Sequence, residues 1–531
     1  MPSLSRRVRG RLAPLGLALA VVGLAAAWAM ASPVGGTPDE PAHVEYAWGV
    51  ATGQVLPGNE RVVVDENGAS VVHVRMPTSL LEYENRTCYQ GDPSASPGCG
   101  WESSLHPQDE VDRPTYMTRY PPLYYGVVGT VLRVGLEVGL SGHHTLLLAR
   151  FVSGVLSLGM VAGAALVLAR RGWHAGAAVA VLAGLTPVML SLASSVNPNG
   201  FEVGAAVLGA ALVVAVRHDH AGAAAVRTPT VTALLLALVA LTWTRPLSLV
   251  WAFLLVGVLL LPGGPLGGLW QRHRWAVVAA GASLVAAVAW LGWATQTRVI
   301  GEEDDSVDWG TIPVDVRTLL VLLKFGDLVR QMVGWIGWDT TLPDLAVVGW
   351  VGVTVVAVTL LVTGSARAST RLRDAWGFLG LSAAVVAAYS MLTAFGWQGR
   401  YLLPAVAAGL VLAVPSMQGA SLSATTLRRT VVVSSAWFLT VQLGALSWFL
   451  WRYMYGVESV YARFAALPLR IDDVGWIPPV SQAVVLGLGL VGTLTLGAAL
   501  VGPVVVAART AAAGDGHDAP RPVRAAEGQS K

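Results

Sequence analysis

The stretch LAPLGLALAVVGLAAAWAMA, residues 12–31, decides the fold class because it contains no charged side chain. A helix of about 20 apolar residues crosses the hydrocarbon core of a membrane, which is about 30 Å thick. Residues 146–169 and 479–507 are similarly apolar. Over the whole chain 13% of residues are charged, whereas soluble domains carry about 25%. The sequence therefore predicts an all-α polytopic membrane protein, with residues 12–31 as a retained anchor and not a cleaved signal peptide.

The distribution of arginine predicts how the chain crosses the membrane. Positively charged flanks resist translocation, so arginine-rich gaps between apolar segments mark cytoplasmic loops. After the N-terminal arginines, these gaps are residues 170–171, 217–227, 272–274, 367–373 and 428–429, followed by the tail. The apolar segments are 12–31, 146–169, 173–195, 200–216, 229–243, 247–262, 275–294, 345–363, 376–395, 401–416, 430–451 and 479–507. We expect about twelve spans in the inner (cytoplasmic) membrane, with both termini in the cytoplasm.

This topology predicts one membrane domain, residues 1–510, with three large outer loops and a disordered cytoplasmic tail. The first loop ends in segment 122–140, which is short and carries Arg133 and Glu137, so we expect a helix lying in the interface. The outer loops are residues 32–140, 295–344 and 452–478, and the tail is residues 511–531.

The two cysteines, Cys88 and Cys99, both fall in the first outer loop. In an oxidising compartment two such thiols can close a disulfide. The alternative is that both thiols stay free.

Charge and motif content exclude several classes of protein. The net charge is +3, and the basic residues are scattered between apolar segments, so nucleic-acid binding is not expected. The chain has no Walker loop and no GxGxxG fingerprint. His143, His144, His218 and His220 form no metal-ligand pattern with acidic partners.

The motif PDEPAH, residues 38–43, directly follows the first predicted span. Adjacent carboxylates point in different directions, so one can take a proton from a hydroxyl while the other orients the site or holds a metal. The flanking prolines restrict the backbone and would hold the pair at the membrane surface. We expect Asp39 to act as general base with Glu40 in support, and a divalent metal near Asp39, Glu40 and His43 stays open. The alternative is a solvated acidic helix start.

Two further motifs lie where the predicted topology places helix ends on the outer side. RYPPLYY, residues 119–125, offers a cation and stacked aromatic rings for a phosphate and a sugar, although interfacial tyrosines also serve as plain anchors. NPNG, residues 197–200, offers side-chain amides for sugar hydroxyls, and the alternative is an ordinary turn between two helices.

Two arginines and an acidic aromatic cluster complete the candidate site. Arg245, in TWTRPL, and Arg400, in WQGRYLLP, could bind a phosphate in a bidentate geometry or anchor their helices at the surface. Tryptophans around Asp339, in GWIGWDT, could stack on a sugar or form an interfacial belt. The candidate substrate-binding residues are His43, Arg119, Tyr124, Tyr125, Asn197, Asn199, Arg245, Trp338, Asp339, Gln398, Arg400 and Tyr401.

The combination of PDEPAH, RYPPLYY, NPNG and WQGRYLLP, spread over about residues 33–450, resembles a bacterial membrane-protein family catalogued as domain of unknown function 2142. That family is similar to the GT-C superfamily of lipid-carrier-dependent glycosyltransferases, which have a large first outer loop and an acidic motif directly after the first helix. Asp39 and Glu40 match the acidic motif by position, and residues 121–125 match a proline-tyrosine segment. His43 has no established counterpart there, which leaves the metal question open.

The resemblance implies an inverting transferase that takes a sugar from a polyprenyl-phosphate carrier. It implies a cell-envelope glycan, lipid or protein as acceptor, with membrane lipids around the protein. Two alternatives stay open at this point. One is a carrier or flippase for a lipid-linked glycan, which also needs cationic groups within a many-helix bundle. The other is a non-catalytic subunit of an envelope-assembly complex.

Overall fold

The structure is a computed structural model that describes residues 2–55, 58–64, 70–81, 89, 92, 95–96, 109–221, 226–297, 312–337, 340–364, 368–393, 397–418, 421–456 and 475–515. Cys88, Cys99, Trp338 and Asp339 lie outside the described residues, as do parts of all three predicted outer loops and the tail after residue 515. The disulfide and the sugar-binding roles of Trp338 and Asp339 therefore stay predictions.

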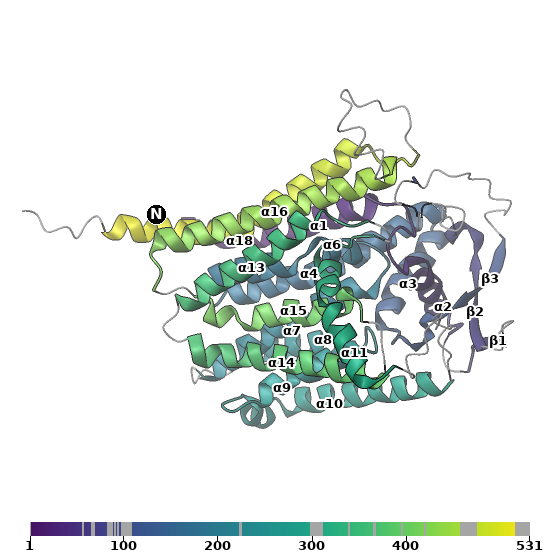
Figure 1. Cartoon of the computed structure of the whole chain (residues 1–531), viewed down its shortest axis with the longest axis horizontal. Coiled ribbons are helices and arrows are strands. Elements are labelled where there is room, and N and C mark those ends of the chain that lie inside the picture. Colours follow the sequence, from purple (N-terminus) through teal and green to yellow (C-terminus); the bar gives the residue numbers. More distant parts are fainter. Residues whose placement is uncertain are drawn as a thin grey trace, which may run out of the picture.

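The chain folds into a bundle of long helices with a small sheet at one end, and the N-terminus lies at the opposite end (Figure 1). We call the end with the sheet the sheet end. The opposite end is called the arginine end, because the arginine-rich gaps after residues 169 and 216 follow helices that run away from the sheet. The helices are α1 (Pro2–Met30), α2 (Glu40–Ala51), α3 (Leu123–Glu137), α4 (Gly142–Ala169), α5 (His174–Gly184), α6 (Pro187–Ala193), α7 (Pro198–Ala221), α8 (Thr228–Thr242), α9 (Ser248–Leu260), α10 (Leu266–Thr297), α11 (Val314–Leu323), α12 (Phe325–Val333), α13 (Asp344–Thr363), α14 (Ala368–Thr393), α15 (Gly399–Leu412), α16 (Ala424–Tyr455) and α18 (Gln482–Asp515).

The long helices make the chain a multi-pass membrane protein. Among the described residues, nine helices are long and apolar enough to cross a membrane, and the bent pair α5–α6 makes a tenth if it is one span. Helices α8 and α9 match the predicted spans 229–243 and 247–262, but with 15 and 13 residues they are shorter than the nine long helices. The predicted segments therefore coincide with helices, while the count of about twelve spans stays a prediction because it includes these two.

The predicted span 173–195 is broken into α5 and α6, which meet at an angle of 70°. Pro187 has no backbone N–H to continue the helix, and Thr186 begins the new one by accepting a hydrogen bond from the Met189 amide at 3.2 Å. All of α6 is buried, so the break is covered by protein, as a hydrocarbon surrounding requires. The bend brings the end of α6 directly to the NPNG motif.

The predicted cytoplasmic gap 272–274 is not a loop. It lies inside α10, where His273 takes a non-helical conformation with φ −134° and ψ 36°. Two helical stretches therefore meet at His273 with no loop between them.

The first outer loop contains a three-stranded antiparallel sheet in the order β1 (Arg61–Val64), β2 (Ser70–Pro77) and β3 (Glu110–Thr115), which the sequence analysis did not predict. One face of β2, with Val72, Val74 and Met76, is buried in a second hydrophobic core with α2 and α3. An added Cβ at Gly129 of α3 would lie 2.0 Å from the carbonyl oxygen of Ala47 in α2, so this glycine permits the close packing of the two helices. Sheet and α3 together fix α2 at the sheet end.

The predicted orientation can be tested by labelling with a membrane-impermeant thiol reagent. In a chain with both native cysteines replaced by serine, a cysteine at exposed Asn59, next to β1, should react in intact cells. A cysteine at exposed Arg429, at the start of α16, should react only after the cells are opened, because the arginine end is expected in the cytoplasm. Reaction of Arg429→Cys together with protection of Asn59→Cys would reverse the orientation.

Candidate functional site

Asp39 stands at the start of α2 in a conformation that is unusual for its residue type. Its φ is +62°, and it is the one non-glycine residue with positive φ in the part of the chain that the structure describes. Aspartate tolerates this left-handed region better than most residues, yet such a conformation persists only when the surrounding structure imposes it. Backbone strain of this kind clusters at functional sites, so the conformation marks Asp39 as a candidate functional residue.

The Asp39 carboxylate forms an ion pair with Arg400, which lies 361 positions further along the chain. Arg400 is in the first turn of α15, and its Nη2 donates to Oδ2 of Asp39 at 2.6 Å. The side chains of Asp39 and Arg400 are 23% and 11% exposed. The Nε and Nη1 atoms of Arg400 are buried and have no hydrogen-bond partner among the described residues. Two guanidinium nitrogens are therefore left for another anion.

Helix α12 sets the position of Arg400. The backbone N–H of Gly399 donates to Oε1 of Gln331 at 2.7 Å. An added Cβ at Gly399 would lie 2.2 Å from the carbonyl oxygen of Leu328, so only glycine allows α15 to begin this close to α12.

Arg400 of this ion pair lines an open cavity of about 180 Å³. Pro38, Gln398 and Arg400 form one part of its lining, and Gln331 and Trp335 form another. A mainly apolar pocket with a few converging polar groups is the usual form of a small-molecule site. Here the polar groups are two amides and a guanidinium, with an indole among them.

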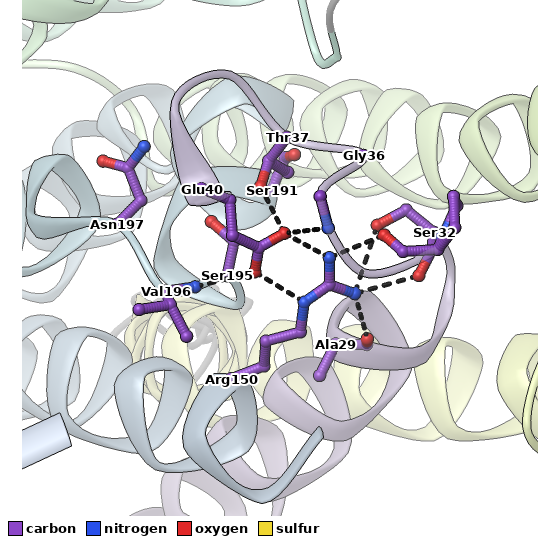
Figure 2. Close-up of polar contacts among 12 residues, drawn as sticks. Ala29, Ser32, Gly36, Thr37, Glu40, Arg150, Ser191, Ser195, Val196 and Asn197 are labelled. Atoms are coloured by element: carbon purple, nitrogen blue, oxygen red, sulfur yellow. Dashed lines mark hydrogen bonds and ion pairs between the residues drawn. The ribbon is translucent and has the colours of Figure 1, made fainter. Parts of the chain in front are cut away.

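Glu40, next to Asp39 in sequence, is fully buried and does not line this cavity. Figure 2 shows its carboxylate facing Arg150. Its carboxylate pairs with Arg150 of α4, whose Nε donates to Oε1 at 2.7 Å. The same carboxylate accepts hydrogen bonds from the Gly35 and Val196 amides, at 2.9 and 3.0 Å, and from the Thr37 hydroxyl at 3.1 Å. Burial by itself raises the pKa of Glu40, but the charge and hydrogen bonds of Arg150 and the two amides outweigh it and lower the pKa below its ordinary value.

Arg150 also ties down the chain between α1 and α2 (Figure 2). It donates to the carbonyl oxygens of Ala29, Ser32 and Pro33 at 3.0, 2.9 and 2.7 Å. Together with Glu40 it holds this connection in one conformation, which imposes the left-handed backbone of Asp39. Glu40 and Arg150 are therefore positioning residues, because neither reaches the cavity.

The NPNG motif links this buried pair to a second one. The Asn197 amide Nδ2 donates to the carbonyl oxygen of Pro38 at 3.0 Å, directly before Asp39. The Oδ1 atom of Asn197 accepts from the Asn199 backbone amide at 3.0 Å and from its side-chain Nδ2 at 2.6 Å. Asn199 in turn accepts a hydrogen bond from Arg245. Both asparagines are buried, and their amides bond within the protein.

Arg245 is internally paired. Its Nη1 contacts Oε2 of Glu202 in α7 at 3.0 Å, and Ser248 donates to the other oxygen of Glu202 at 2.8 Å. The guanidinium lies 4.7 Å from the ring centroid of Tyr401 and 5.6 Å from that of Tyr120. The sequence did not indicate this carboxylate partner of Arg245. Because Arg245 is already paired with Glu202, Arg400 is the better placed of the two arginines to bind a phosphate.

His43 is buried between aromatic rings and bonds through Nδ1 to the Tyr125 hydroxyl at 2.9 Å. Burial lowers the pKa of His43. The charge of Asp39 raises it, but the positive charges of Arg245 and Arg400 lower it further, and the resulting pKa is about 3. The ring is therefore neutral at any ordinary pH. It belongs to the core beside the site and does not face the cavity.

A divalent metal does not fit Asp39, Glu40 and His43. Each carboxylate is already paired with an arginine, and the Nδ1 of His43 is bonded to Tyr125. No group of three or more His, Cys, Asp or Glu side chains suited to a metal occurs among the residues that the structure describes. We derive no step through a metal.

The remaining predicted residues lie around this site. Tyr124 is buried with its hydroxyl 2.9 Å from that of Ser153, and Tyr401 lies between the two guanidinium groups, 5.3 Å from Arg400. Arg119 is half-buried at the end of a short 3₁₀ turn, Met117–Arg119, before α3.

Sequence reasoning missed Arg150 and Glu202. Both are charged residues inside predicted apolar spans, 146–169 and 200–216, and such charges are rare enough to mark a site. Gln331 and Trp335 were also missed, because nothing in the sequence distinguishes them from other residues of a polar loop.

Fold and site together define a multi-pass membrane protein with one polar site among the helix ends at the sheet end. A model of the family described as "Predicted membrane protein (DUF2142)" matches residues 22–408, and the chain belongs to this family.

No curated protein matches the chain. Two solved structures are similar to it, both of ArnT from Cupriavidus metallidurans. The structure bound to undecaprenyl phosphate has 16% sequence identity and a TM-score of 0.43, over 94% of this chain and 78% of that one. The apo structure has 18% identity and a TM-score of 0.38, over 82% and 73% of the two chains. At such TM-scores neither likeness says anything about the reaction of this chain.

Proposed function

We propose that this protein is a membrane glycosyltransferase of the GT-C type that moves a sugar from a polyprenyl-phosphate carrier to a cell-envelope acceptor on the extracytoplasmic side. The observation that carries the proposal is the ion pair of Asp39 and Arg400 at the edge of the cavity. It brings together a carboxylate whose side chain is 23% exposed and a cavity-lining guanidinium with two nitrogens to spare.

Arg400 is the proposed ligand of the donor phosphate. A guanidinium matches a phosphate in a bidentate geometry and stays charged, and its interaction strengthens where water is excluded. Because Arg400 uses only Nη2 for Asp39, Nε and Nη1 remain for the phosphate oxygens. One side chain would then hold the leaving group close to the base.

Asp39 is the proposed general base. It would take the proton of an acceptor hydroxyl while the hydroxyl oxygen forms a bond to the anomeric carbon. The bond from that carbon to the phosphate oxygen breaks at the same time, and polyprenyl phosphate leaves with the electron pair. A single displacement of this kind inverts the anomeric centre. Glu40 supports the reaction from outside the cavity, by fixing the backbone of Asp39.

The cavity offers suitable contacts for a sugar. An indole face stacks on the C–H surface of a sugar ring, and the side-chain amides can donate to and accept from its hydroxyls. Trp335, Gln331 and Gln398 provide these groups within the same lining as Arg400.

Replacing Arg400 by lysine should weaken use of the donor. Lysine keeps the positive charge but lacks the planar fork, so it cannot bond Asp39 and a phosphate through separate nitrogens. We expect the KM for the donor to rise roughly 10-fold to 150-fold, since the loss of a charge-assisted hydrogen bond costs about 1.5 to 3 kcal/mol. The measurement is a titration of turnover with donor in lipid nanodiscs.

Arg330→Lys is the matched control. Arg330 lies on α12, one residue before Gln331, but it pairs with Asp344 at 2.9 Å and is 47% exposed. Its replacement should leave the donor KM unchanged. An Arg400→Lys variant with wild-type KM and turnover would reduce Arg400 to a helix anchor and remove the phosphate site.

A further inference from the structure

A second pocket lies at the arginine end, far along the helices from Asp39. It has a volume of about 430 Å³ and lies between the end of α7, Val226 in the connection before α8, and the beginning of α10. His220, Gln271, Arg272 and His273 are the polar residues of its lining, and none of the described residues that line it is acidic. The pocket therefore favours an anion.

The acidic side chain nearest in sequence does not neutralise this pocket. Asp219, beside His220, pairs with Arg171 at 2.9 Å. Arg272 is exposed and forms no ion pair with any residue that the structure describes, so its charge is available to a ligand. His273 is buried, and its Nε2 lies 3.1 Å from the carbonyl oxygen of Val226, which ties the kink of α10 to the chain before α8. This contact holds the two walls of the pocket together.

Two tryptophans indicate the depth of the pocket in the membrane. Trp270 and Trp275 flank Arg272 on α10 and are 55% and 45% exposed. Exposed tryptophans collect at the level of the lipid headgroups, where the ring is in apolar surroundings and the N–H meets water. Helix α10 also buries little of its apolar surface within the protein, so lipid covers its side. A basic pocket at this depth is therefore in contact with lipid headgroups.

We propose that this pocket binds the phosphate headgroup of an anionic phospholipid in the leaflet at the arginine end, with Arg272 and His220 as its ligands. Basic pockets between spanning helices on this side of a membrane are suited to such headgroups. The bound lipid would bridge α7 and α10 and so support the outermost helix of the bundle. The proposal is independent of the transferase chemistry at the sheet end.

The test is a titration of the purified full-length chain in detergent with fluorescent phosphatidylglycerol and, separately, fluorescent phosphatidylcholine. Wild type should bind phosphatidylglycerol more tightly. Arg272→Gln should weaken that binding roughly fivefold, as one surface cation contributes to anionic-lipid binding, and leave phosphatidylcholine binding unchanged. His220→Gln should weaken it less. Both residues are on the surface, so both variants should unfold at the wild-type temperature.

Arg429→Gln is the control, because Arg429 is exposed at the same end on α16 and does not line the pocket. It should bind phosphatidylglycerol as wild type does. Equal weakening in Arg429→Gln and Arg272→Gln would show a diffuse surface attraction and overturn the site. Wild-type binding by both Arg272→Gln and His220→Gln would do the same. Competition by inorganic phosphate at millimolar concentration would assign the pocket to a soluble phosphate compound and overturn the lipid.

Discussion

Asp39→Asn should fold, insert and bind a polyprenyl-phosphate sugar, yet transfer that sugar roughly 100-fold to 10,000-fold more slowly than the wild type, the range that a positioned base contributes. Asparagine has the shape of aspartate and also tolerates the left-handed backbone at φ +62°, so the loop should keep its conformation. It cannot take a proton from the acceptor. The rate is measured as release of polyprenyl phosphate by the purified protein in lipid nanodiscs.

Asp112→Asn is the matched control for this variant. Asp112 lies in β3 of the same outer loop and also pairs with an arginine, Arg61, at 2.6 Å, but it does not line the cavity. It should transfer sugar at the wild-type rate. Transfer at that rate by Asp39→Asn would remove Asp39 from the mechanism. Glu40→Gln, which disturbs only the positioning of Asp39, should slow transfer less than Asp39→Asn.

Arg150→Met should lower the free energy of unfolding by about 3 to 5 kcal/mol, because it leaves the carboxylate of Glu40 buried without its counter-charge. The size of the effect follows from burial, since both side chains of the pair are 1% exposed. Turnover should fall as well, because the connection that imposes the backbone of Asp39 loses its anchor. Unfolding in detergent measures the first effect, and the transfer assay measures the second.

The pH dependence of Arg150→Met identifies the cause. In wild type the pKa of Glu40 is lowered, so its contribution to stability is present above about pH 4.5 and is lost at lower pH. In the variant the charge and hydrogen bonds of Arg150 are lost, while burial and the two amide hydrogen bonds remain. The pKa of Glu40 is therefore higher than in wild type, and its protonation costs the folded variant less than it costs folded wild type. The difference in stability between variant and wild type should therefore shrink as the pH falls from 7 towards about 4.5.

Two further variants complete this test. Glu40→Gln combined with Arg150→Met removes both charges and should be more stable than Arg150→Met alone. Arg133→Met breaks the exposed pair with Glu137 on α3 and should cost less than about 1 kcal/mol. If Arg150→Met were no less stable than Arg133→Met at every pH, the buried pair would not be what holds the connection between α1 and α2.

The helices could be predicted from the sequence, because apolar runs and arginine-rich gaps are local signals. The sheet could not, since its strands are short and lie in a polar loop. Asp39 and Arg400 were both candidates, and the structure joins them across 361 positions. The partners of Glu40 and Arg245 could not be predicted, because residues that pair between helices distant in sequence show no characteristic sequence spacing. Only the rarity of a charge inside an apolar span would have drawn attention to Arg150 and Glu202.

The most direct test of the proposed function is the fate of a polyprenyl-phosphate sugar incubated with the wild-type protein and cell-envelope acceptors in sealed vesicles. The account predicts that the sugar moves to the acceptor with inversion and that an equal amount of polyprenyl phosphate is released, provided that the sheet end faces the acceptor. Passage of the intact lipid-linked sugar across the vesicle membrane, with no polyprenyl phosphate released, would contradict the account and identify a carrier.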